Sequence, residues 1–150
     1  MPKARFICSS LMKAFSQLQS VKKMTPSDPN APILMFYAAE NLLMAVFTSE
    51  NCDYGAASRK HGSHQLDGML DELPNDCKIK SKFEGIVTLV AYATTYRYPT
   101  PAGRIQEPPG KEEAEGYYTA LIEILNMCTT HFKVDVRLEQ PEAGSVSPMR

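Results

Sequence analysis

The stretch APILMFYAAENLLMAVFT, residues 31–48, decides the fold class of this chain. Its apolar run is 15 residues long and contains two polar residues, Glu40 and Asn41. A membrane-spanning helix needs about 20 apolar residues, so the run is too short to cross a bilayer. Asn30 and Pro32 stand where a helix is capped and begun. The stretch therefore predicts a buried core helix and no membrane partner.

Four further helices are expected outside this stretch. In each of them apolar residues recur every three or four positions, as in an amphipathic helix. The stripes are Ile7, Leu11, Phe15 and Leu18; Leu66, Met69, Leu70 and Leu73; Phe83, Ile86, Val90 and Ala93 in a helix from about 81 to 98; and Tyr117, Leu121, Ile124, Cys128 and His131. Ser63 would cap the second of these. The pattern predicts an all-α protein, an antiparallel up-and-down bundle of four to five helices.

Polar segments rich in glycine or proline join the predicted helices. Residues 49–62 are expected to form a loop, and residues 99–110 a long connector that is mobile or functional. VDVRL, residues 134–138, alternates like a strand but has no partner strand, so we expect coil or a strand that forms only in a dimer. We expect a single domain over residues 1–133 and a flexible tail over residues 134–150.

Composition and the N-terminal sequence argue against several classes of protein. The chain has 16 Lys and Arg against 17 Asp and Glu, so nucleic acid or an anionic membrane could be attracted only by a local patch. The four cysteines lie far apart without a C-x-x-C pair, which is typical of reduced intracellular thiols. Lys13, Gln17 and Gln19 interrupt the start too often for a signal peptide. We therefore expect a cytoplasmic protein with no metal and no cofactor.

Two charged residues of opposite sign fall on predicted apolar faces. Glu40 lies in the middle of the core-helix stripe, and Arg97 continues the stripe of the helix from 81 to 98. A buried charge needs a partner, water or a ligand. In one interpretation Glu40 meets Arg97, or backbone groups, and fixes the helix register. In the other, Arg97 projects into a cleft and grips an anion with its planar fork while Glu40 orients it.

Tyrosines flank Arg97 at the end of its helix. Tyr96 and Tyr98 point to nearly opposite sides of a regular helix, so they share a pocket only if the helix ends between them, as Pro99 allows. One of them could stack on a base or a protein partner, or both could bridge core and solvent.

The remaining basic residues and histidines leave two further interpretations open. Arg59, Lys60, His61, Lys78, Lys80 and Lys82 form either a basic rim for RNA or nucleotide phosphate or an ordinary solvated surface. His131 lies on an apolar helix face, as a core or interface histidine does. His61 and His64 have the spacing of two metal ligands, but no second pair follows, so no metal site is predicted.

Three segments together resemble the HEPN domain family of small helical bundles. FYAAENLLMAVF is similar to the family's Tyr-Ala-Ala-Glu helix, HQLDGMLDEL to its His-x-Leu-x-x-Leu-Leu segment, and TTYRYP to its Arg-Tyr-Pro element at a helix end. The resemblance covers residues 31–99. It implies a bundle that commonly dimerises, in a family of nucleotide binders, ribonuclease toxins of toxin–antitoxin pairs and non-catalytic interaction modules.

The ribonuclease branch of that family resembles a pattern of Arg followed by His after four to six residues. Residues 102–104, at those distances from Arg97, contain no histidine. The segment RKHGSH does match, with Arg59 to bind phosphate and His64 to act as acid or base, but it lies in the predicted loop and not after the 81–98 helix.

We therefore expect a non-catalytic, homodimeric HEPN-like module that binds a nucleotide-like anion, RNA phosphate or a protein partner. The expected ligand-binding residues are Glu40, His64, Tyr96, Arg97 and Tyr98. The alternatives are a metal-independent ribonuclease that uses Arg59 or Arg97 together with His64, and a purely architectural dimer.

Overall fold

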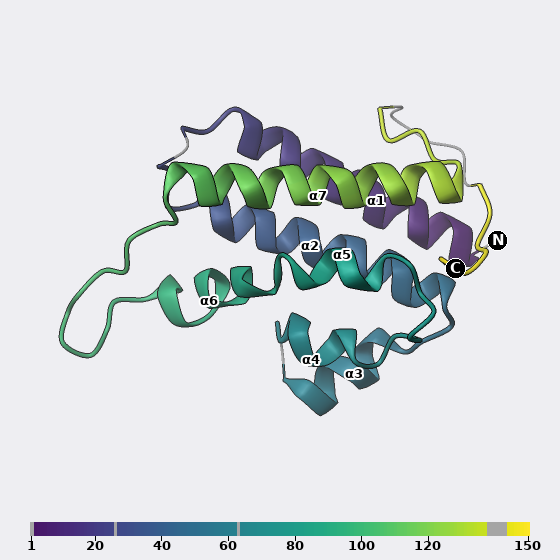
Figure 1. Cartoon of the computed structure of the whole chain (residues 1–150), viewed down its shortest axis with the longest axis horizontal. Helices are drawn as coiled ribbons and strands as arrows, with labels where there is room; N and C mark the ends of the chain where they lie inside the picture. The colour runs from purple at the N-terminus through teal and green to yellow at the C-terminus, as the bar shows by residue number, and fades with distance from the viewer. Residues whose placement is uncertain (1, 26, 63, 138–143) are drawn as a thin grey trace.

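Three long helices form the framework of the computed structural model, which describes residues 2–25, 27–62, 64–137 and 144–150. They are α1 (Pro2–Lys22), α2 (Ala31–Ser49) and α7 (Lys111–Phe132), and each contacts the other two. In Figure 1, α1 runs opposite to α2, the chain returns through α5 and α6, and α7 runs in the same direction as α2. No strand occurs among the described residues, so the all-α prediction is confirmed.

Shorter helices connect this framework. They are α3 (Tyr54–His61), α4 (Leu66–Leu70), α5 (Lys80–Glu84), the 3-10 turn η1 (Val87–Leu89), α6 (Val90–Ala93) and the 3-10 turn η2 (Thr95–Arg97). The described part thus has more and shorter helices than the four to five that the sequence predicts.

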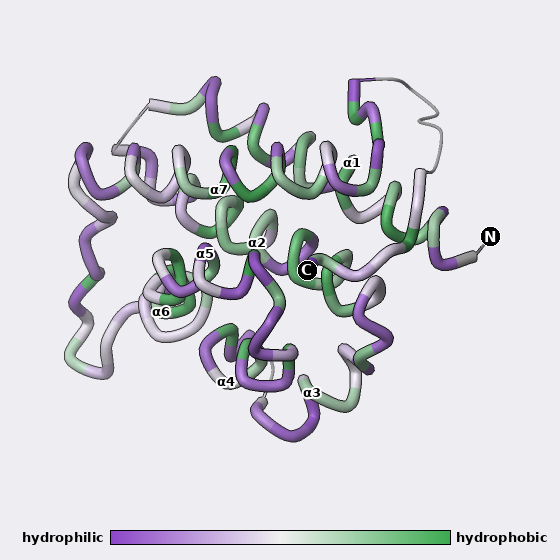
Figure 2. The backbone as a smooth tube through the Cα atoms, turned by 45° about the vertical axis from the view of Figure 1, so that its right-hand side comes forward, coloured by the Kyte–Doolittle hydropathy of each residue, from purple (hydrophilic) through white to green (hydrophobic). Residues whose placement is uncertain are grey.

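Helix α2 is the centre of the core. It contacts α1, α3, α6, α7 and η1, and Figure 2 shows it mostly in the green of hydrophobic residues between its neighbours. The apolar run predicted to be too short for a membrane span lies in a helix of 19 residues, and among the described helices α2 alone is long and apolar enough to cross a membrane by length and composition. Core helices share this property. Inside this fold, 67% of its apolar window is buried.

The predicted helix from 81 to 98 is broken into four pieces. Ile86 has φ −121° and ψ 6°, and Thr94 has φ −119° and ψ −86°, so neither continues a helix. Gly85 and a run of β-branched residues weaken the helix here, and the Thr94 hydroxyl donates to the Val90 carbonyl at 2.8 Å. The apolar stripe therefore stops at Ala93. Arg97, predicted to extend it, is exposed instead.

The predicted loop over residues 49–62 contains a helix, so that prediction is wrong for α3. Asp53 caps α3 by accepting the backbone N–H of Ala56 at 3.0 Å, and Gly62, with a φ of +92°, ends it. The connector over residues 99–110 has no helix, as expected. Ser63, the predicted cap of the next helix, lies outside the described residues.

The segment predicted as a flexible tail packs against the helices where it is described. Val134 and Met149 are buried, and Arg150 contacts two carboxylates. Residues 134–137 form coil and a turn. Leu138, the last residue of the alternating VDVRL segment, lies outside the described residues.

Candidate functional site

Glu40 binds His64 in this structure, and not Arg97. Its Oε2 atom lies 2.8 Å from His64 Nδ1 and 3.5 Å from the hydroxyl oxygen of Tyr54. The Glu40 side chain is 12% exposed, whereas that of His64 is 40% exposed. A nearly buried carboxylate of the core helix is thus satisfied by α3 and by the turn before α4.

Aromatic rings hold His64 in place. The Phe36 ring packs edge-on against the imidazole with centroids 5.5 Å apart, and Tyr37 lies at 6.5 Å. His64 has a φ of +65°, an uncommon conformation for a residue with a side chain. Because Nδ1 faces Glu40, Nε2 points away from the carboxylate on a partly exposed ring.

Tyr54 is a hydrogen-bond donor to this carboxylate. Burial raises the pKa of its phenol, and the charge of Glu40 and the hydrogen bond to it raise the pKa further. The phenol therefore stays protonated at neutral pH and can donate to Glu40. The sequence prediction missed Tyr54, because the residue was assigned to a loop. The signal that could have placed it at the start of a helix was the capping residue Asp53 directly before it.

A histidine oriented by a carboxylate can transfer a proton through its outer nitrogen or donate a hydrogen bond to an anion. Arg59, the predicted phosphate-binding partner of His64, is exposed on α3. A Cβ added at Gly55 would lie 3.3 Å from Arg59 Nη1 and 3.4 Å from Asp53 Oδ1, so the guanidinium folds back over the start of α3. No hydrogen bond joins Arg59 to His64 within the described part of the chain.

The neighbouring basic residues join α3 to the turn that follows α4. His61 Nε2 lies 2.8 Å and Lys60 Nζ 2.9 Å from Glu72 Oε1. Hydrogen bonds from Lys60 and then His61 hold the pKa of Glu72 below its ordinary value. A Cβ at Gly68 would lie 2.6 Å from His61 Nδ1, so this close approach requires glycine. Lys60 and His61 are therefore used within the fold.

Two lysines of the predicted basic rim also contact groups of the fold. Lys80 donates to the Leu73 carbonyl at 3.1 Å, and Lys82 pairs with Glu123 at 2.8 Å. Lys60, His61 and Lys82 thus contact carboxylates, whereas Lys80 contacts neutral acceptors, so only part of the charge of the predicted rim is compensated.

The second group of candidate residues surrounds Arg97 in η2. Its guanidinium carbon lies 5.8 Å from the centroid of the Tyr98 ring, and no carboxylate pairs with it among the described residues. Tyr98 is 65% exposed and Tyr96 40% exposed. The Tyr96 ring packs edge-on against Tyr92 with centroids 5.3 Å apart. This end of the molecule presents a cation and two aromatic rings to solvent.

A hydrogen-bonded tyrosine of α7 anchors the segment before this cluster. The Tyr117 hydroxyl lies 2.6 Å from Thr88 Oγ1 and donates to Glu113 Oε1 at 2.7 Å. Burial, with smaller contributions from Glu113 and Tyr92, raises the pKa of Tyr117 to about 12. The sequence prediction placed Tyr117 in the core only; Glu113, one helical turn earlier, was the signal for its polar role.

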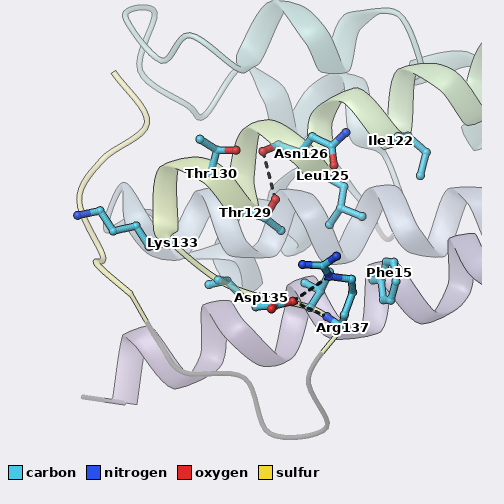
Figure 3. Close-up of a pocket in the computed structure, with 11 residues that line it drawn as sticks. Phe15, Ile122, Leu125, Asn126, Thr129, Thr130, Lys133, Asp135 and Arg137 are labelled. Carbon is cyan, nitrogen blue, oxygen red and sulfur yellow. Dashed lines mark hydrogen bonds and ion pairs between the residues drawn. The ribbon is translucent and has the colours of Figure 1, made fainter.

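A groove of about 580 Å³ lies away from these residues, between α1, α7 and the segment after α7. Figure 3 shows Asp135 and Arg137 joined at its edge and Phe15 at its side. Arg137 Nε lies 3.3 Å from Asp135 Oδ1. The groove contains no predicted site residue.

His131 partly matches its predicted role. Its Nε2 atom lies 3.0 Å from the Ser147 carbonyl oxygen, and its ring packs against Phe132. The residue is partly buried at the end of α7.

Metal ligands are not gathered in the part of the chain that the structure describes, which has no group of three or more His, Cys, Asp or Glu able to hold an ion. Comparison of the chain with protein-family models, curated proteins and solved structures finds no match in any of the three.

Proposed function

We propose that this chain is a non-catalytic binding module that takes a nucleotide-like anion at Arg97, Tyr96 and Tyr98. The observation that carries the proposal is the exposed Arg97 guanidinium beside the exposed Tyr98 ring. A guanidinium grips phosphate, and an exposed aromatic ring stacks on a base, so the cluster offers both contacts that a nucleotide needs.

We further propose a HEPN-like bundle as its fold, acting as a homodimer in the cytoplasm. Two of the segments that carry the resemblance touch in space, since Glu40 of the Tyr-Ala-Ala-Glu helix binds His64 of the His-x-Leu segment. The order of α1, α2, the α5–α6 segment and α7 is compatible with an up-and-down bundle whose third long member is broken.

Thermal unfolding with adenine and guanine mononucleotides and a short RNA tests this binding. We expect an increase in Tm for the wild type, because a ligand present at 100 times its Kd stabilises the folded state by about 2.7 kcal/mol. Arg97→Ala removes that increase, whereas Arg104→Ala, on the exposed connector, keeps it. A wild type that no probe stabilises contradicts the proposal. If its Tm instead depends on protein concentration alone, the architectural dimer is favoured.

The Glu40–His64 pair favours a second candidate function, a metal-independent ribonuclease. The carboxylate fixes the imidazole so that Nε2 can serve as acid or base, and Arg59 on the neighbouring helix could bind phosphate after a side-chain rotation. Incubation of RNA with the wild type and with His64→Ala separates the two functions. Cleavage by the wild type that the folded His64→Ala variant loses supports the enzyme, and absence of cleavage from both contradicts it.

A further inference from the structure

Residues 144–150 lie against the fold in the way that a bound peptide lies in a groove. The Lys78 N–H donates to the Met149 carbonyl at 3.0 Å, and the Ser147 carbonyl lies 3.0 Å from His131 Nε2. The Met149 side chain is only 4% exposed. Figure 1 shows this segment in yellow beside the end of α2.

A buried carboxylate receives the arginine of this segment. The Glu50 side chain, directly after α2, is 0% exposed, and its Oε2 accepts from Arg150 Nη2 at 3.1 Å. Asp76 accepts from the other terminal nitrogen of the guanidinium at 3.0 Å. Glu50 Oε1 has no hydrogen-bond partner among the described residues. A carboxylate so deeply buried costs free energy unless a cation pairs with it, so the position beside Glu50 favours a cationic group.

The surroundings of Glu50 are suited to this pairing. Burial and then the negative charge of Glu50 raise the pKa of the neighbouring Cys77 thiol to about 11, so no second anion forms there at neutral pH. A groove of about 790 Å³ continues from Met149 and Arg150 along the outer side of α7, past Met127 and Ile122. There is room beyond the segment for a longer ligand.

We infer that Glu50, Asp76, Lys78 and the end of α7 form a peptide-binding groove, and that residues 144–150 occupy it as an intramolecular ligand. One main-chain hydrogen bond from Lys78 and the contact of the His131 ring hold the backbone, the buried Met149 position takes an apolar side chain, and the two carboxylates take a guanidinium. The partner that fits is an extended peptide with an apolar residue directly followed by arginine. This site does not involve Arg97, so it can exist whether or not the nucleotide proposal holds.

Tethering explains how the groove can be occupied and still be exchangeable. A segment of the same chain acts at an effective concentration of the order of millimolar, so a free peptide competes poorly with it. Weakening the tethered segment should expose the groove to the same sequence added in trans.

The test uses the full chain and a fluorescent peptide of sequence GSVSPMR that is blocked at its N-terminus. Binding is followed by fluorescence anisotropy. We expect the double variant Met149→Ala, Arg150→Ala to bind the peptide at least about tenfold more tightly than the wild type, since its own segment no longer competes. A peptide with Arg replaced by Gln should bind at least about tenfold more weakly than GSVSPMR, because the charge-assisted hydrogen bonds are lost. Adding Glu50→Gln to the double variant should weaken GSVSPMR binding similarly, while adding Glu84→Gln, an exposed carboxylate on α5, leaves it unchanged.

Because the double variant leaves Glu50 unpaired, circular dichroism checks its fold, and Met149→Ala alone provides a second test in which Arg150 still neutralises Glu50. Its affinity for GSVSPMR should lie between those of the wild type and the double variant. If Met149→Ala binds no better than the wild type, or if folded variants bind both peptides equally, the inference is overturned.

Discussion

Two regions of the molecule differ in how their charged residues are used. One is the corner between α3 and α4, whose residues contact Glu40 of α2 and Glu72, and the other is the end of η2. At the corner, Glu40 and Glu72 each accept from two side chains. At η2, Arg97 is exposed, and its guanidinium lies beside the Tyr98 ring. Both regions carry a charge that the sequence places on an apolar face, yet only one of them buries it.

The difference follows from whether the helix that carries the charge stays regular. Helix α2 is uninterrupted, so Glu40 keeps its place near the core and must be satisfied by Tyr54 and His64. The backbone at Thr94 leaves the helical conformation, so Arg97 turns out to solvent, where it needs no partner. A satisfied charge supports the fold, and an unsatisfied, exposed one is available to a ligand.

Removal of one partner from each region should have very different effects. His64→Ala leaves the Glu40 carboxylate with the Tyr54 hydroxyl as its side-chain donor among the described residues. We expect the free energy of unfolding to fall by about 2–3 kcal/mol, allowing for the partial exposure of His64. Arg97→Ala should change it by no more than about 0.5 kcal/mol, as surface substitutions do. Urea denaturation of both variants measures the two values.

Equal losses in these variants would mean that Arg97 has a structural role after all. His64→Gln provides a further control, because an amide can still donate a hydrogen bond toward Glu40. It should recover part of the stability that His64→Ala loses.

The contact of His61 with Gly68 gives a second, smaller test of the corner. Gly68→Ala places a methyl group 2.6 Å from His61 Nδ1, so the ring must move away from Glu72, and we expect a loss of about 1–2 kcal/mol. Gly116→Ala is the matched control, because nothing lies within 4 Å of the added Cβ and alanine favours a helix by about 0.5–1 kcal/mol. Urea denaturation should give changes of opposite sign, and a stabilised Gly68→Ala would contradict the packing.

The all-α class could be predicted from the sequence because the apolar periodicity of α1, α2 and α7 is long enough to outweigh local irregularity. The short helices could not be predicted in this way. The helix α3, for example, depends on one capping residue, Asp53, within a polar segment. The break at Thr94 was missed for a related reason. The apolar periodicity continues through Thr94 in the sequence. The helix nevertheless ends there, because β-branched residues weaken it and the Thr94 hydroxyl bonds to the Val90 carbonyl.

Site residues could be predicted singly but not as pairs. The pattern showed that Glu40 needed a partner and suggested Arg97 or backbone groups, whereas the observed partner is His64, because the pairing depends on how α3 and α4 pack against α2. Arg150 was assigned to a flexible tail from its polar, proline-containing surroundings. No periodic pattern links it to Glu50, which lies 100 positions earlier in the chain.

The smallest expected effect is a pH dependence at Glu72. Hydrogen bonds from Lys60 and His61 lower its pKa below the ordinary value of 4.5, so the folded state binds this proton less readily than the unfolded state does. The stabilisation by Glu72 is therefore complete above pH 4.5 and is lost as the pH falls through the lower pKa of the folded state. In Glu72→Gln the acid-dependent decrease in unfolding free energy should be shallower in that range, and the difference from wild type should shrink in high salt because the carboxylate is partly exposed to solvent. Identical acid titrations of stability for wild type and Glu72→Gln would show that the contacts of Lys60 and His61 with this carboxylate contribute nothing to joining α3 and α4.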